Sequence, residues 1–109
     1  MTPDLSNQVV DALPIGSIVT RFGNNYITGY SALDGSTLST TTYSSLLNYA
    51  LNSNQVVETY VYDGEMDTNG YCYKFGYNSG DTSFRLPTIP SINNIYSYIK
   101  VTNILVPSN

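Results

Sequence analysis

The sequence predicts a strand-rich α+β domain with one amphipathic helix, and three observations support this. Only the segment from Tyr43 to Leu51 has apolar residues at the helical spacing i, i+3, i+4, i+7 and i+8. Most other apolar segments alternate with a period of two, as strands do, and Gly, Pro and Asn separate them at short intervals. The chain has 109 residues, 41% of them hydrophobic, which is enough for one domain with a modest core.

The first elements are expected to be strands. Residues 14–22 form a strand that places Ile18, Thr20 and Phe22 on one face, with Pro14 at its start, where a missing N–H matters least. A turn at 23–25 leads to a second short strand at 26–28. The segment before this region, residues 1–12, is polar and is interpreted as a linker or short helical lead-in.

A turn at Asp34 and Gly35 precedes the helix. Asp bonds readily to its own backbone and Gly accepts a positive φ, so both are assigned a structural role in this turn. The Ser and Thr residues of 36–42 offer hydroxyls that cap a helix N-terminus. The helix is predicted from about Thr40 to Leu51, lying on the sheet with its apolar stripe.

The second half is predicted to be strands and loops. A strand at 55–62, a loop at 63–70 and a strand at 71–77 would form a hairpin with an aromatic face. A short strand at 82–86 ends at Pro87. The last strand, 95–104, is expected to bury one set of side chains and expose the alternate set; the buried set is Ile95, Ile99 and Val101, and the exposed set is Tyr96, Tyr98, Lys100 and Thr102.

The composition excludes several classes of function. The net charge is −4 and the four basic residues are scattered, which argues against a nucleic-acid partner. There is no His, and the single Cys72 permits no internal disulfide or thiolate cluster, so no metal or other cofactor is expected. No apolar run is long enough to span a membrane. Charged residues make up only 11%, so Ser, Thr and Asn must form most of the polar surface, which suits extracellular or particle surfaces; biased amino-acid usage explains this equally well.

Tyrosine is the candidate binding residue, with eleven copies and no Trp. Its ring offers a flat apolar face and its hydroxyl a polar edge, so it suits a sugar or a protein surface. The predicted contact surface for a saccharide or protein consists of Tyr60, Tyr62, Tyr71, Tyr73 and Tyr77. The alternative is that this aromatic face is the core or an interface between subunits, which is where such faces usually lie.

Several acidic residues are candidates for metal binding or catalysis. Asp63, Glu65, Asp67 and Asn69 alternate as in a calcium loop, but Thr68 and Lys74 stand where an EF-hand needs Gly and Glu. The pairs Asp34–Asp81 and Glu65–Asp67 are conceivable for glycoside cleavage, yet nothing fixes their separation. The chain is therefore predicted not to be an enzyme.

Four blocks of sequence resemble the bacteriophage tail collar domain of short tail fibres and receptor-binding fibre tips. Their order and spacing are more specific than any single block, and they lie at Pro14–Ile18, Gly29–Ser39, Tyr43–Leu47 and Phe84–Pro87. Residues 98–101 are also similar to the end of many fibre tips. Two features depart from the family pattern: Thr88 follows Leu86-Pro87, and the segment between helix and closing strand is long.

The resemblance implies a homotrimeric fibre-tip domain over residues 13–109, with 52–81 as a variable insert and with residues 1–12 as a linker or lead-in from a fibre shaft. It implies a location at the tip of a virion tail fibre, facing the extracellular medium, with the rest of the fibre or baseplate as a partner. Its function would be adsorption to a bacterial surface polysaccharide or protein. The alternatives are a purely structural trimerisation or capping domain and a lectin-like module of a cellular protein.

Overall fold

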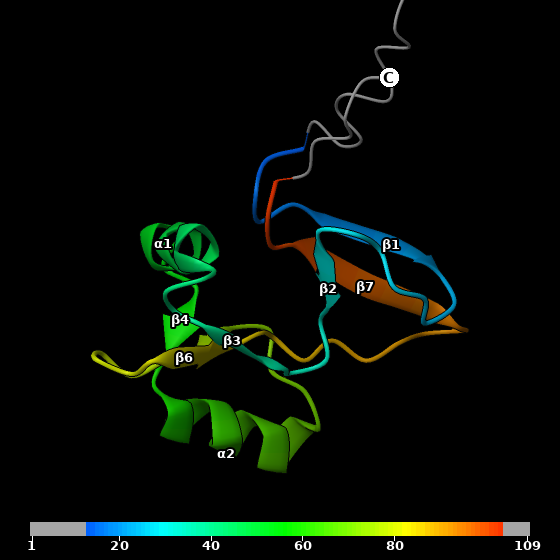
Figure 1. The fold of residues 1–109 in the computed structure, drawn as a ribbon. Coiled ribbons are helices and arrows are strands. Elements are labelled where there is room, and N and C mark those ends of the chain that lie inside the picture. The colour runs from blue at the N-terminus through cyan, green and yellow to red at the C-terminus, as the bar shows by residue number, and fades with distance from the viewer. Residues whose placement is uncertain (1–12, 104–109) are drawn as a thin grey trace, which may run out of the picture.

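The computed structural model describes residues 13–103, which form an α+β fold with two sheets and two helices. The three-stranded sheet has the order β1-β7-β2 and is antiparallel throughout. Its strands are β1 (Ile18–Phe22), β2 (Tyr30–Ala32) and β7 (Ile95–Lys100). Figure 1 shows this sheet beside a second, four-stranded sheet, on which both helices pack. The predicted lead-in 1–12 lies outside the described residues.

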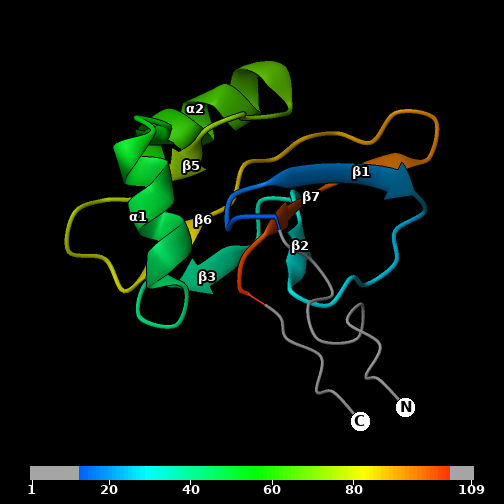
Figure 2. The ribbon, with the colours of Figure 1, turned by 90° about the horizontal axis from the view of Figure 1, so that it is seen from above.

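The four-stranded sheet has the order β3-β6-β5-β4. Its strands are β3 (Thr37–Ser39), β4 (Val56–Val57), β5 (Phe75–Gly76) and β6 (Ser83–Arg85). Helices α1 (Ser44–Asn52) and α2 (Thr59–Asn69) lie on its two opposite faces, and Figure 2 shows the same elements from above. Neighbouring residues of a strand point to opposite faces, so Phe75 and Phe84 face α1 while Gly76 and Arg85 face α2.

The helix predicted at 40–51 is present, although it begins four residues later as α1. Leu46, Leu47 and Ala50 of the predicted stripe are buried, and Tyr43 packs against the core, whereas Leu51 is exposed. The prediction that a hydroxyl of the Ser/Thr run caps the helix is wrong, because the N-cap residue is Tyr43 and no side chain caps α1. Ser39 Oγ accepts hydrogen bonds from the backbone N–H groups of Thr41 and Thr42, both at 3.2 Å. These bonds order the turn that leads into the helix.

The predicted hairpin of 55–62 and 71–77 is wrong, and so is the expectation of a single helix. Residues 59–69 form α2, and β4 pairs with β5 in parallel. Parallel neighbours need a crossover connection, which α2 provides. The helix ends at Gly70, which is left-handed with φ 77° and donates to the carbonyl of Met66. Only Tyr62 of the helix is buried, so the segment has no apolar stripe that would have identified it.

The last strand was predicted in part. Ile99 and Val101 are buried in the main core, as expected. Tyr98 and Lys100 are also buried, against prediction, because both faces of β7 are covered at residues 98–100: Ile99 packs into the main core on one face, and Tyr98 and Lys100 contact Gly23 and Leu13 on the other. The Lys100 ammonium donates to the carbonyl of Leu13 at 2.5 Å. Ile95, predicted to be inside, is 37% exposed.

The main core joins the two sheets. It lies between α1, the α1-facing side of the four-stranded sheet and the end of β7, and it consists of Leu33, Leu46, Leu47, Ala50, Phe75, Phe84, Leu86, Ile99 and Val101. Four of the sequence blocks named above contribute to or flank this cluster, so they fold as one unit.

Candidate functional site

The five predicted binding tyrosines do not share one surface. Tyr60 and Tyr62 are two positions apart on α2, so they point to nearly opposite sides of the helix. Tyr60 is 71% exposed, whereas Tyr62 is fully buried and is therefore a core residue, not a contact residue. The aromatic face predicted for 60–62 with 71–77 is not formed, because the helix replaces one of its strands.

The other three tyrosines lie beyond α2. Tyr71 and Tyr73 stack with ring centroids 4.5 Å apart, and Tyr73 is exposed. Tyr77 is half-buried against the core and lines an open cleft of about 390 Å³ with Leu51, Asn54, Val56 and Ser79. The structure thus separates the predicted group into an exposed Tyr60, a stacked Tyr71–Tyr73 pair and a cleft-lining Tyr77, whose binding role stays a prediction.

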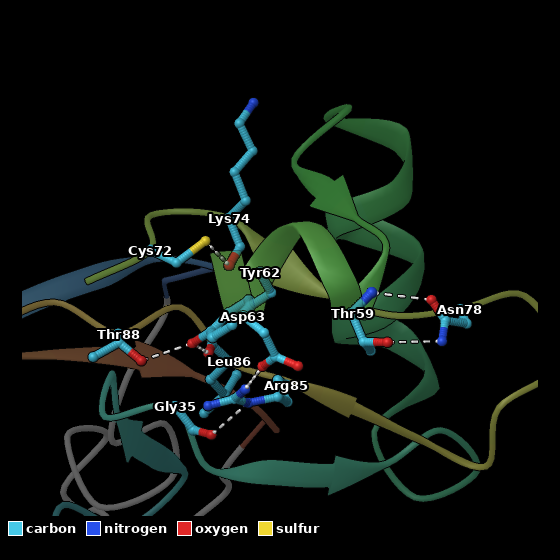
Figure 3. A network of polar contacts seen from close by, with 10 residues as sticks. All are labelled: Gly35, Thr59, Tyr62, Asp63, Cys72, Lys74, Asn78, Arg85, Leu86 and Thr88. Carbon is cyan, nitrogen blue, oxygen red and sulfur yellow. Dashed lines mark hydrogen bonds and ion pairs between the residues drawn. The ribbon is translucent and has the colours of Figure 1, made fainter. Parts of the chain in front are cut away.

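Tyr62 is the centre of a polar network that joins α2 to β6, to the residues that follow β6 and to the Asp34–Gly35 turn (Figure 3). Its hydroxyl donates to the carbonyl of Leu86 at 2.6 Å and shares a hydrogen bond with Thr88 Oγ1 at 2.7 Å. Arg85 lies over the Tyr62 ring, with Cζ 4.1 Å from the centroid, which is cation–π geometry. Arg85 also pairs with Asp63 at 3.0 Å and donates from Nε to the Gly35 carbonyl.

This network is structural. Burial raises the pKa of the Tyr62 hydroxyl, while its hydrogen bond with Thr88 and the Arg85 charge oppose that shift. Tyr62 therefore remains protonated at neutral pH and acts as a hydrogen-bond donor instead of a nucleophile. A separate pair of hydrogen bonds lies at the start of α2, where the Asn78 side chain accepts from Thr59 N and donates to Thr59 Oγ1 (Figure 3).

The turn at Asp34 and Gly35 has the predicted chemistry. Asp34 Oδ1 accepts from the Ser36 backbone N–H at 3.0 Å and from the Ser36 hydroxyl. Gly35 has φ +82°, and a Cβ placed there would lie 2.5 Å from Thr88 Oγ1. Both residues are thus required by the local backbone, which leaves Asp34 with a sufficient structural role.

The acidic residues weighed for calcium lie on α2 instead of a loop. A helix spreads successive alternate residues around its axis, so they do not converge on one point. Asp63 pairs with Arg85, and Glu65 accepts from the Asn69 side chain at 3.1 Å. Among residues 13–103, no three His, Cys, Asp or Glu side chains lie close enough to hold a metal ion.

A second cleft, which the sequence did not predict, lies between β2, β7 and the loop after β1. We call it the β1–β2 cleft; it has a volume of about 300 Å³ and is lined by Asn24, Asn25, Tyr26, Ile27, Tyr30, Ser31, Ala32 and Tyr98. Tyr98 fixes the loop by donating its hydroxyl to the Gly23 carbonyl at 2.9 Å. Tyr26 is 82% exposed at the rim, whereas Tyr30 and Tyr98 are buried beneath it.

An apolar stripe covers one face of β1 and its neighbours, and we call it the β1 stripe. It consists of Ile18, Phe22, Ile92 and Ile95, of which Ile18 is 56%, Phe22 72% and Ile92 70% exposed. Phe22 pairs with Ile95 and Ile95 with Ile92, so their side chains share a face. Among the described strands, β1 pairs only with β7, so its other edge is open.

Comparisons of the chain with protein-family models, with curated proteins and with solved structures found no match. Within residues 13–103, neither helix is long and apolar enough to cross a membrane.

Proposed function

We propose that this protein is the receptor-binding tip domain of a bacteriophage tail fibre, and that it adsorbs to a glycan or protein on the bacterial surface without catalysing a reaction. The observation that carries this proposal is an uncharged, tyrosine-bearing surface with an open cleft built from aromatic, amide and hydroxyl groups. Such surfaces bind by shape and hydrogen bonding at a low cost in conformational entropy.

The resemblance to the tail collar domain supports the same proposal. Its four blocks converge in space: Leu33, Leu46 and Phe84, one from each of three blocks, are buried in the same core. The fourth block leads into β1, and the backbone N–H of its Gly16 donates to the Lys100 carbonyl. Leu33 and Phe84, which are 51 positions apart in sequence, therefore belong to one folding unit, as a shared domain signature requires.

We propose a homotrimer, and the β1 stripe supports assembly. A small domain without disulfide or metal staples often relies on oligomerisation for stability. The stripe presents four large apolar side chains on one face beside an open strand edge. Exposed apolar patches of this kind typically mark an interface.

The second candidate function is a structural trimerisation or capping domain of the fibre, and the β1 stripe favours it equally. In either case the proposed location is the fibre tip on the virion, facing the extracellular medium, with the remaining fibre or baseplate as a partner. A nucleic-acid partner is not proposed, because Arg85 is paired with Asp63 and Lys100 is buried, which leaves a weak basic surface.

An array of immobilised bacterial polysaccharides and outer-membrane proteins tests the proposal. The labelled full chain is expected to bind a small subset of spots saturably, and unlabelled protein is expected to compete. Binding to none of the spots, with an intact trimer in solution, would favour the capping function. Release of shorter saccharides from bound spots would show turnover and overturn the non-enzymatic assignment.

A further inference from the structure

The β1–β2 cleft is lined only by uncharged residues. Three tyrosines contribute aromatic surface, and they come from three separate segments: Tyr26 from the loop, Tyr30 from β2 and Tyr98 from β7. The register of β2 against β7, in which Ala32 pairs with Tyr98 and Tyr30 with Lys100, places Tyr30, Ala32 and Tyr98 on one face of the sheet. The cleft therefore has a floor set by a paired sheet and a rim set by the loop.

The rim of the cleft carries polar side-chain groups that form no hydrogen bond within the described part of the chain. The side-chain amides of Asn24 and Asn25 and the hydroxyl of Tyr26 make no hydrogen bond to other residues of 13–103, and all three residues are exposed. An amide both donates and accepts, and so does a sugar hydroxyl. A carboxylate or phosphate ligand would want a cationic partner, which the lining does not offer.

We propose that the β1–β2 cleft binds a neutral sugar ring, stacked on Tyr26 and hydrogen-bonded by Asn24 and Asn25. Its volume of about 300 Å³ is at the lower end of small-molecule sites, which suits one or two rings. The cleft beside Tyr77 is a weaker candidate, because only one aromatic residue lines it. This inference rests on the proposed receptor-binding function and names the ligand class of that function.

Titration of the 109-residue chain with sugars, monitored by amide ¹H–¹⁵N spectra, tests the inference. The probes are D-galactose, D-glucose and N-acetyl-D-glucosamine, each up to about 50 mM, which is well above the ~1 mM affinity of a weak site. At least one probe is expected to shift the resonances of Asn24 to Ala32 and of Tyr98 saturably. D-glucuronate is expected to bind no better, because the lining has no cation.

Two variants locate the binding. Tyr26→Ala removes the exposed rim ring and is expected to weaken sugar affinity about tenfold, which corresponds to a ring contact of about 1.4 kcal/mol. Tyr49→Ala is the control: Tyr49 is a half-exposed aromatic residue on α1, outside the cleft, and its replacement is expected to leave the affinity unchanged. Loss of affinity in both variants, or in neither, would overturn the assignment of the cleft.

The outcomes separate this inference from the proposed function. Binding of the protein to bacterial spots without any shift in the cleft would overturn the sugar site and leave receptor binding intact. A saturable shift in the cleft with no binding to any bacterial component would support the sugar site and contradict receptor binding. Shifts that depend on protein concentration instead of sugar would assign the cleft to a second copy of the chain and overturn the inference.

Discussion

Phe22→Ser is the substitution that separates assembly from folding. Phe22 is 72% exposed in the single chain, so most of its apolar surface can still be buried by another subunit. Full burial of a Phe side chain contributes up to about 3 kcal/mol, so the exposed part contributes about 2 kcal/mol for each subunit. Three equivalent copies make this about 6 kcal/mol per trimer, which lowers the association constant by roughly four orders of magnitude.

Sedimentation velocity over a range of concentrations measures this effect. The wild-type chain is expected at about 36 kDa, three times the 12.0 kDa of one chain, and Phe22→Ser is expected to dissociate towards 12.0 kDa on dilution. Thermal unfolding of the dissociated variant should remain cooperative, because Phe22 contributes little to the core of the single chain.

Tyr60→Ser is the matched control for this experiment. Tyr60 is 71% exposed, but it lies on α2 and not on the β1 stripe, so the trimer is expected to persist. A stable trimer of Phe22→Ser at every concentration, or equal dissociation of both variants, would refute the assignment of the stripe to the interface.

The remaining predictions concern the Tyr62 network and the turn. Tyr62→Phe removes the hydroxyl that bonds Leu86 and Thr88 and should lower the free energy of unfolding by about 1–3 kcal/mol in urea melts; an unchanged midpoint would contradict the network's role. The pKa of Tyr62 is raised in the folded state, so the unfolded state loses its proton first. The contribution of Tyr62 to the free energy of unfolding should therefore be complete below pH ~10 and should decrease as the pH rises further. The free energy of unfolding of Tyr62→Phe should depend less on pH in that range. Gly35→Ala forces a Cβ against Thr88 at φ +82° and should cost about 2 kcal/mol or more, read from the melting temperature; a neutral effect would mean that the turn relaxes freely.

Residues with strong local patterns were predictable from the sequence. Leu46, Leu47 and Ala50 repeat at helical spacing and are buried, and the strand at Ile18–Phe22 lies within the predicted 14–22. The α2 segment was not predictable in this way, because Tyr60, Val61 and Tyr62 favour strands and only Tyr62 of the helix is buried. The one local signal for α2 is Gly70, because a glycine can end a helix in the left-handed conformation. The role of α2 as a crossover depends on the parallel pairing of β4 with β5, which no local pattern reveals.

The burial of β7 shows a second limit. Where both faces of a strand are covered, as at residues 98–100, the side chains on both faces are buried. The alternating pattern therefore does not distinguish the burial of Tyr98 and Lys100 from that of Ile99. The β1–β2 cleft was missed for a related reason, because its tyrosines at 26, 30 and 98 are joined only by the β2–β7 pairing. The one local signal is the Asn24-Asn25-Tyr26 run, which the sequence predicts to be a turn leading into a strand at 26–28; that strand is wrong, because residues 26–28 belong to the loop and β2 begins at Tyr30.

Saturable binding of the labelled full chain to living bacteria tests the central claim most directly, because the trimer and the cleft are both proposed to serve attachment. At least one strain in a broad panel is expected to bind the protein, with competition by unlabelled protein and by polysaccharide extracted from that strain. Binding to every strain at the level of heat-denatured protein, without saturation or competition, would contradict it.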